Sequence, residues 1–147
     1  MALSRHETRI KAFQALYQLF FEKNTDLTIE QAVKNAFTGE EDDIAELQES
    51  EFLIELVKGA LEHRVEIDSL ISQHLKNWKI EQLNSVDVLI LRMGVLEINF
   101  IGDTPAAVVI NEMINLSKMF SNKKSEQLIN AVLDHIAKSK NKSEEMH

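Results

Sequence analysis

The stretch SVDVLILRMGVLEIN, residues 85–99, decides the fold of this chain. Wound as an α-helix, it carries apolar side chains on most of its sides, which is typical of a helix surrounded by other helices. One basic residue, Arg92, interrupts it. A charged side chain is stable in such a place only when it is paired, so we expect Arg92 to form a buried ion pair with a carboxylate on a helix. The stretch therefore predicts a central, buried helix.

Amphipathic helices are expected on both sides of this central segment, because apolar residues recur there at helical spacing. They cover residues 4–24, 28–37, 105–120 and the chain from 125 onward; a further long helix begins at 50, and its apolar pattern resumes over 67–75. The segment NWKIEQLN, residues 77–84, is predicted to be a bend in which Trp78 fills the core.

Residues that favour helix starts mark these boundaries. Two capping boxes are predicted, one from Ser4 and Glu7 and one from Thr28 and Gln31. The remaining predicted starts are Ser50 as a cap, Thr104 as an N-cap with Pro105 in the first helical position, and Ser125 as the cap of the last helix.

The fold class follows from what is scarce in the chain. It has one proline and four glycines, and no segment shows the alternation of a strand. A chain of 147 residues suits a single domain. We expect an all-α bundle of six to seven helices forming one domain over residues 1–147, with a flexible tail from about residue 139.

Composition excludes several classes of protein. Without cysteine, the chain can form no disulfide, thiolate nucleophile or cysteine-ligated zinc site. It has no membrane-length apolar run and no signal-peptide pattern, so we expect a cytoplasmic protein that does not bind a membrane.

No catalytic constellation is visible, so we expect no enzyme, no cofactor and no metal. The five histidines do not follow a metal-binding spacing, and no phosphate-binding glycine loop or nucleophile elbow occurs. Glu97 and Glu112 sit beside apolar residues and are interpreted as acids satisfied by nearby backbone groups or by Arg92. The acidic segment 40–51 is interpreted as a solvated loop.

The charge of the chain is unevenly distributed. The net charge is −8, yet residues 1–24 carry four basic against two acidic residues and residues 117–142 carry six against two. The segment between them carries six basic against eighteen acidic residues. Arg5, Arg9 and the run NKKS at 122–125 are therefore candidate contacts to nucleic-acid phosphates. From the residues alone, a helical protein-interaction module remains the alternative.

Several blocks of the sequence resemble the NusB family of transcription antitermination factors. The blocks are RIKAFQALYQ near the start, VDVLILRMGVLEI in the centre, and DTPAAVVINEMINLSKMF followed by SEQLINAVLDHIA. Their order and spacing match over about residues 5–137. The resemblance implies an all-α fold of two helical halves and no enzymatic activity. It also implies binding of boxA RNA together with NusE, a small-subunit ribosomal protein, within an RNA polymerase elongation complex on ribosomal RNA operons.

The same resemblance places the functional residues. RNA contacts correspond to Arg5, His6 and Arg9 at the amino end, and to Lys123, Lys124, Ser125 and Leu128 between the last two helices. The NusE-facing positions are Tyr17 and Asp87.

This chain departs from the family pattern at two places. Its amino end carries fewer arginines, and Leu128 stands where an aromatic residue is common. The oligomeric state, including a homodimer, is left open. A free-standing relative of the NusB-like domain of ribosomal RNA cytosine methyltransferases is a further alternative, although the length leaves no room for the methyltransferase domain itself.

Overall fold

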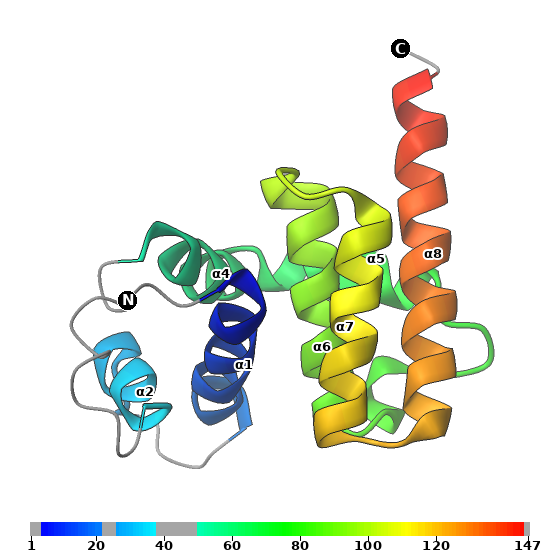
Figure 1. Cartoon of the computed structure of the whole chain (residues 1–147). Helices are drawn as coiled ribbons and strands as arrows, with labels where there is room; N and C mark the ends of the chain where they lie inside the picture. Colours follow the sequence, from blue (N-terminus) through cyan, green and yellow to red (C-terminus); the bar gives the residue numbers. More distant parts are fainter. Residues whose placement is uncertain (1–3, 22–25, 38–49, 146–147) are drawn as a thin grey trace. The chain divides into compact units, whose positions relative to one another are not determined.

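The computed structural model describes residues 4–21, 26–37 and 50–145 (Figure 1). All regular structure in these ranges is helical, as predicted. The α-helices are α1 (Arg5–Phe21), α2 (Ile29–Asn35), α4 (Glu51–Glu62), α5 (Arg64–Gln73), α6 (Ser85–Val95), α7 (Ala106–Phe120) and α8 (Lys123–Glu145). A 3-10 turn, η1 (Ile80–Gln82), and a π-helical turn, η2 (Leu96–Ile101), complete the set. Most of the expected acidic loop and Gly39, the predicted end of the second helix, lie outside the described residues.

The chain divides into two compact units, residues 1–62 and 63–147, in agreement with the two helical halves that were expected. In the first unit, α1 packs against both α2 and α4. Its core consists of small and apolar side chains spaced three and four residues apart on each helix, including Ala12, Phe13, Leu16, Ala32, Val33, Leu53, Leu56 and Val57. The ammonium of Lys11 closes the end of α2 by donating a 2.9 Å hydrogen bond to the carbonyl of Ala36.

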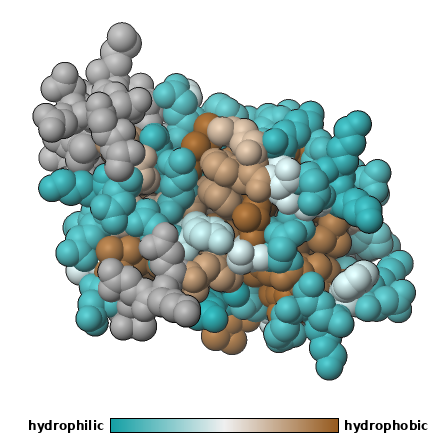
Figure 2. All heavy atoms as spheres, turned by 90° about the horizontal axis from the view of Figure 1, so that it is seen from below, coloured by the Kyte–Doolittle hydropathy of each residue, from teal (hydrophilic) through white to brown (hydrophobic). Residues whose placement is uncertain are grey.

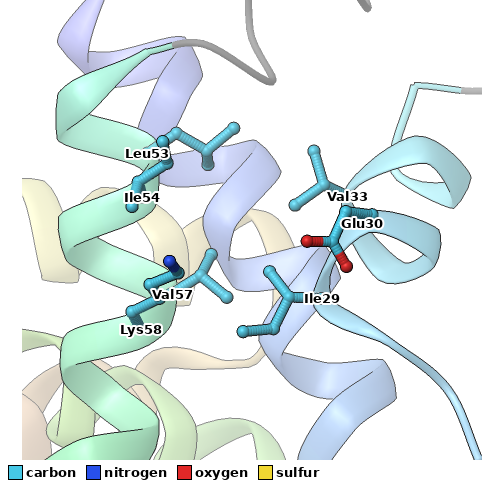
Figure 3. A pocket seen from close by; sticks show the side chains of 7 residues that line it. All are labelled: Ile29, Glu30, Val33, Leu53, Ile54, Val57 and Lys58. Atoms are coloured by element: carbon cyan, nitrogen blue, oxygen red, sulfur yellow. The ribbon is translucent and has the colours of Figure 1, made fainter.

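The first unit also contains a small hollow of about 140 Å³ between α2 and α4 (Figure 3). Its walls are mainly aliphatic, with Ile29 and Val33 facing Val57, and Glu30 and Lys58 also line it. None of the predicted site residues lines this hollow.

In the second unit, α6 is the central helix, in contact with α5, α7 and α8. Every residue from Asp87 to Ile98 is buried, which confirms the prediction from the opening stretch. The guanidinium of Arg92 binds both carboxylate oxygens of Asp68 on α5, at 2.8 and 3.0 Å, so the expected ion pair is also confirmed. Glu97 is buried as well, whereas Glu112 is half-buried.

Helices α6 and α8 approach closely at Gly94. A Cβ atom at this position would lie 2.6 Å from Cδ1 of Leu133 and 3.2 Å from Cγ of Met113. Real Cβ atoms do not approach carbon atoms to 2.6 Å, so this close contact between α6 and α8 requires a residue without a side chain at position 94.

Several local predictions are confirmed. Thr28 and Gln31 form the predicted capping box of α2. The hydroxyl oxygen of Ser4 accepts the amide of Glu7 at 3.1 Å, and that of Ser50 accepts the amide of Leu53 at 3.4 Å.

The end of the chain differs from the expectation of a flexible tail from about residue 139, because helix α8 continues to Glu145.

Other local predictions were wrong. The apolar pattern that starts at 50 and resumes at 67 belongs to two helices, separated at His63. Pro105 is the N-cap of α7 and has an extended backbone, so it does not occupy the first helical position. Trp78 does not fill the core, because 58% of its surface is exposed. It follows Asn77, whose φ of 67° lies in the left-handed region that asparagine tolerates. Trp78 lies between α5 and η1, outside both helices.

Candidate nucleic-acid interface

The start of α6 is joined to the turn between α7 and α8 by one buried carboxylate, that of Asp87. Asn84 caps α6 by accepting the amide of Asp87 at 2.8 Å, and its side-chain amide donates to Oδ2 of the same residue at 2.9 Å. The hydroxyl groups of Ser121 and Ser125 approach the two carboxylate oxygens at 3.1 and 2.8 Å. Asp87 is only 5% exposed, so the structure gives this predicted partner contact an internal role.

Ser125 does not cap the last helix as predicted. Asn122 is the cap instead, since its side-chain oxygen accepts the amide of Ser125 at 3.0 Å. The helix consequently starts at Lys123, three residues earlier than a cap at Ser125 would give, and the Ser125 side chain is buried against Asp87. This arrangement explains why a residue placed among the RNA contacts by the resemblance is 3% exposed.

The capping by Asn122 places Lys123 and Lys124 on the exposed first turn of α8. Leu128, one turn later, is half-buried. Lys124, Ser125, Leu128 and Asp87 line one surface hollow of about 330 Å³, so the structure brings together four of the residues predicted from the resemblance. The hollow is further lined by Trp78, Gln82, Leu83, Asn84 and Asn122. On the right of Figure 2, where this end of the second unit faces the viewer, hydrophobic surface is interspersed with hydrophilic side chains.

The amino-terminal candidates lie on the first two turns of α1. Arg5 and His6 are exposed, and the Arg5 guanidinium lies 4.4 Å from the centre of the Phe52 ring. The guanidinium of Arg9 lies over the same ring at 5.1 Å, but this residue is only 3% exposed. Both arginines were predicted as phosphate contacts, but only Arg5 is exposed, and Arg9 is buried. Its long side chain is held by an aromatic ring of α4, a contact invisible in the sequence of α1.

Tyr17 belongs to a row of aromatic rings along α1. Its ring centre lies 6.2 Å from that of Phe13 and 5.4 Å from that of Phe21, at the four-residue spacing that brings side chains together on a helix. Tyr17 is half-buried and Phe21 is 36% exposed. The row thus offers a partly exposed aromatic surface in the first unit.

The described residues contain no group of three or more His, Asp or Glu side chains that could hold a metal ion. Among the helices of those same ranges, none combines the length and the apolar character needed to cross a membrane.

Sequence reasoning missed Asn84, Asn122 and the exposure of Trp78. Asparagine favours helix starts, and both asparagines directly precede helical patterns, so the caps were detectable. The exposure of Trp78 could not be predicted, because a single aromatic residue in a bend carries no periodicity that assigns it to the core or the surface.

The geometry defines an all-α protein with exposed basic side chains at the first turns of two helices, one in each unit. The model of the NusB family matches residues 6–138, and the chain belongs to this family.

Individual relatives agree with this assignment. A transcription antitermination protein NusB from Listeria innocua is 41% identical over 135 residues, which cover 92% of this chain and 97% of that protein. The protein of the same name from Lactiplantibacillus plantarum is 38% identical over 140 residues, covering 95% and 98% of the two chains.

Solved structures are also similar. T. maritima NusB has a TM-score of 0.79 at 31% identity, with 94% of this chain and 93% of that chain covered. A chain in the crystal structure of antitermination factors NusB and NusE in complex with double-stranded RNA has a TM-score of 0.73 at 27% identity, with coverage of 92% and 96%. The family resemblance and the all-α fold predicted from the sequence are thereby confirmed.

Proposed function

We propose that this chain is a transcription antitermination factor that binds boxA RNA together with NusE, and that it has no enzymatic activity. The name of its relatives and the NusB–NusE–RNA complex among similar structures support this proposal. The observation on this chain that carries it is the pair of exposed lysines, Lys123 and Lys124, at the start of α8 beside the hollow lined by Leu128. Lysine side chains in this arrangement can neutralise phosphates while unpaired bases enter the hollow.

The amino end supplies the second part of the proposed RNA surface. Arg5 and His6 are exposed there, and the Arg5 guanidinium lies 4.4 Å from the centre of the Phe52 ring. We assign phosphate contact to Arg5 and His6, and to Arg9 the role of supporting them from below the surface. In this proposal residues 1–147 act as one RNA-binding domain composed of both units.

The proposed NusE surface includes Tyr17, whose half-buried ring lies in the aromatic row of α1. Asp87 contributes by holding the start of α6 in place. The strongly acidic middle of the chain suits a basic ribosomal protein, because complementary charge speeds encounter. Action in the cytoplasm within an RNA polymerase elongation complex on ribosomal RNA operons belongs to the same proposal, and the oligomeric state, including a homodimer, stays open.

The test is fluorescence anisotropy with labelled single-stranded boxA RNA and a scrambled RNA of equal length, with and without purified NusE, at two salt concentrations. Tighter binding to boxA, strengthened further by NusE, is the expected result. Equal binding to both RNAs in every condition would contradict the proposal and favour a helical protein-interaction module. Co-purification with a catalytic methyltransferase chain would favour the alternative of a free-standing targeting domain.

A further inference from the structure

Trp78 is the large apolar side chain least explained by the fold of the second unit. Its surface is 58% exposed, although a buried indole contributes far more to stability than an exposed one. Among the residues that the structure describes, it takes part in no ring–ring or cation–π contact and in no side-chain hydrogen bond. The indole therefore presents much of its aromatic surface to the solvent.

The backbone before Trp78 is unusual as well. Asn77 is the one residue other than glycine in the described ranges with a positive φ, at 67°. A residue in this conformation turns the chain sharply after α5, and the following side chain leaves the direction that a continuing helix would have given it. The exposure of Trp78 thus depends on the turn at Asn77 as well as on the packing around it.

The surroundings of Trp78 suit a nucleobase. Trp78 and Leu128 line two adjoining surface hollows of about 330 and 320 Å³ and stand between them. Lys124 lines the first hollow and Lys76 the second, and both are exposed. The first hollow is also lined by Gln82 and Asn122, whose side-chain oxygens accept the backbone amides of Lys79 and Ser125. Their side-chain nitrogens can donate to acceptors on the edges of bases.

The charge around the ring is positive. Lys76, Lys79, Lys123 and Lys124 are exposed on the two segments that border the hollows, residues 74–84 and 122–128. Of the two acids on these segments, Glu81 is exposed, while Glu126 is paired with Lys118 at 3.9 Å. The carboxylate of Asp87 in the first hollow is buried and already accepts hydrogen bonds from Asn84 and Ser125. An aromatic surface among lysines favours a polyanion with flat, unpaired bases, which is single-stranded RNA.

We propose that Trp78 is a stacking platform for an unpaired base of the bound RNA, with Leu128 beside it and Lys124 on the phosphate that follows. This inference rests on the proposed function, since it specifies how that RNA is held. Stacking on an indole is tolerant of base identity, so Trp78 contributes affinity while the amide side chains of the first hollow contribute selectivity.

Trp78 is the only tryptophan of the chain, so intrinsic fluorescence reports on this residue alone. We would titrate the full chain with single-stranded boxA RNA and with the same RNA carrying abasic sites, using free tryptophan to correct for absorption by RNA. Quenching by the intact RNA that weakens with the abasic RNA is the expected result.

Affinity is then measured by anisotropy for Trp78→Ala, Trp78→Phe and the control Val65→Ala, which alters a 79% exposed residue of the same unit. Trp78→Ala should weaken binding by roughly 5-fold to 150-fold, the usual effect of removing one stacked ring. Trp78→Phe should recover most of this loss, and Val65→Ala should match the wild type. The salt dependence should stay unchanged in Trp78→Ala, because no phosphate contact is removed. Thermal unfolding of each variant checks that the fold is retained.

Failure of this inference can be told apart from failure of the proposed function. RNA binding by the wild type, with unaltered fluorescence and an affinity of Trp78→Ala within twofold, would overturn the role of Trp78 and leave RNA binding intact. A fluorescence change that occurs with NusE and not with RNA would make Trp78 a protein contact and overturn the inference. Absence of RNA binding by the wild type, with and without NusE, would overturn both.

Discussion

The hydroxyl group of Ser125 lies 2.8 Å from Oδ2 of Asp87, a residue 38 positions earlier in the chain. The Ser121 hydroxyl lies 3.1 Å from the other carboxylate oxygen, and the two serine oxygens are 2.6 Å apart. Because each hydroxyl has a single proton, at most two of these three contacts are hydrogen bonds at one time. The carboxylate thus connects the start of α6 with the turn that presents Lys123 and Lys124.

Replacing Asp87 by alanine should lower the free energy of unfolding by about 2–3 kcal/mol, because buried hydroxyl and amide groups lose a charged acceptor. Equilibrium urea unfolding measures this loss. Asp87→Asn is the matched control and should lose less, since its side-chain oxygen still accepts one hydrogen bond. Equal losses for both variants would show that the charge of Asp87 contributes most of the stabilisation.

The pair formed by Arg92 and Asp68 should behave as a buried ion pair open to water at one end, since Arg92 is 7% and Asp68 26% exposed at the side chain. Asp68→Ala should cost about 1–3 kcal/mol of unfolding free energy, because it leaves a buried guanidinium without this partner. Adding Arg92→Met to that variant should restore part of the stability. A double variant less stable than Asp68→Ala would contradict this view and indicate that other contacts of Arg92 dominate.

Gly94→Ala should destabilise the second unit by about 1–2 kcal/mol, despite the better helix propensity of alanine. The added methyl group would meet Leu133, which is fully buried and has little space to move. Thermal unfolding tests this prediction. Combined with Leu133→Ala, the same substitution should cost much less than it does alone, and strict additivity of the two changes would contradict the proposed clash.

Substitutions of Arg5 and of Arg9 should affect RNA binding and stability differently, although both side chains lie over the Phe52 ring. Arg9→Ala removes a buried side chain and should lower the unfolding free energy by about 1–2 kcal/mol. Arg5→Ala, at an exposed position, should change it by no more than about 0.5 kcal/mol while weakening RNA binding. Urea unfolding and anisotropy on the same two samples provide the comparison, and similar stability losses for both would refute the distinction.

The lysines at the start of α8 should determine part of the salt dependence of RNA binding. Replacing Lys123 and Lys124 by alanine should reduce the slope of log K against log salt by up to about 1.4, since each phosphate contact to a single strand contributes about 0.7. Lys138→Ala with Lys142→Ala makes the same change in net charge further along α8 and should leave the slope nearly unaltered. Equal effects of the two pairs would indicate a general charge effect without a defined site.

Much of this architecture could be predicted from the sequence. Helix positions follow from apolar residues repeating every three to four positions, and a continuous apolar stretch identified α6 as the central helix. The need to pair a buried charge predicted an ion pair for Arg92 before its partner was known. These features depend on residues within a few turns of one another, so the local sequence contains them.

Contacts between distant residues were decided by the tertiary structure alone. Asp68 as the partner of Arg92, Phe52 beneath Arg5 and Arg9, and the meeting of Ser125 with Asp87 each join residues at least 24 positions apart. No local pattern encodes such pairs, because they depend on how whole helices pack. For the same reason Trp78 was wrongly assigned to the core: its hydrophobicity is a property of the residue, whereas its exposure results from the left-handed turn at Asn77 and the packing around it.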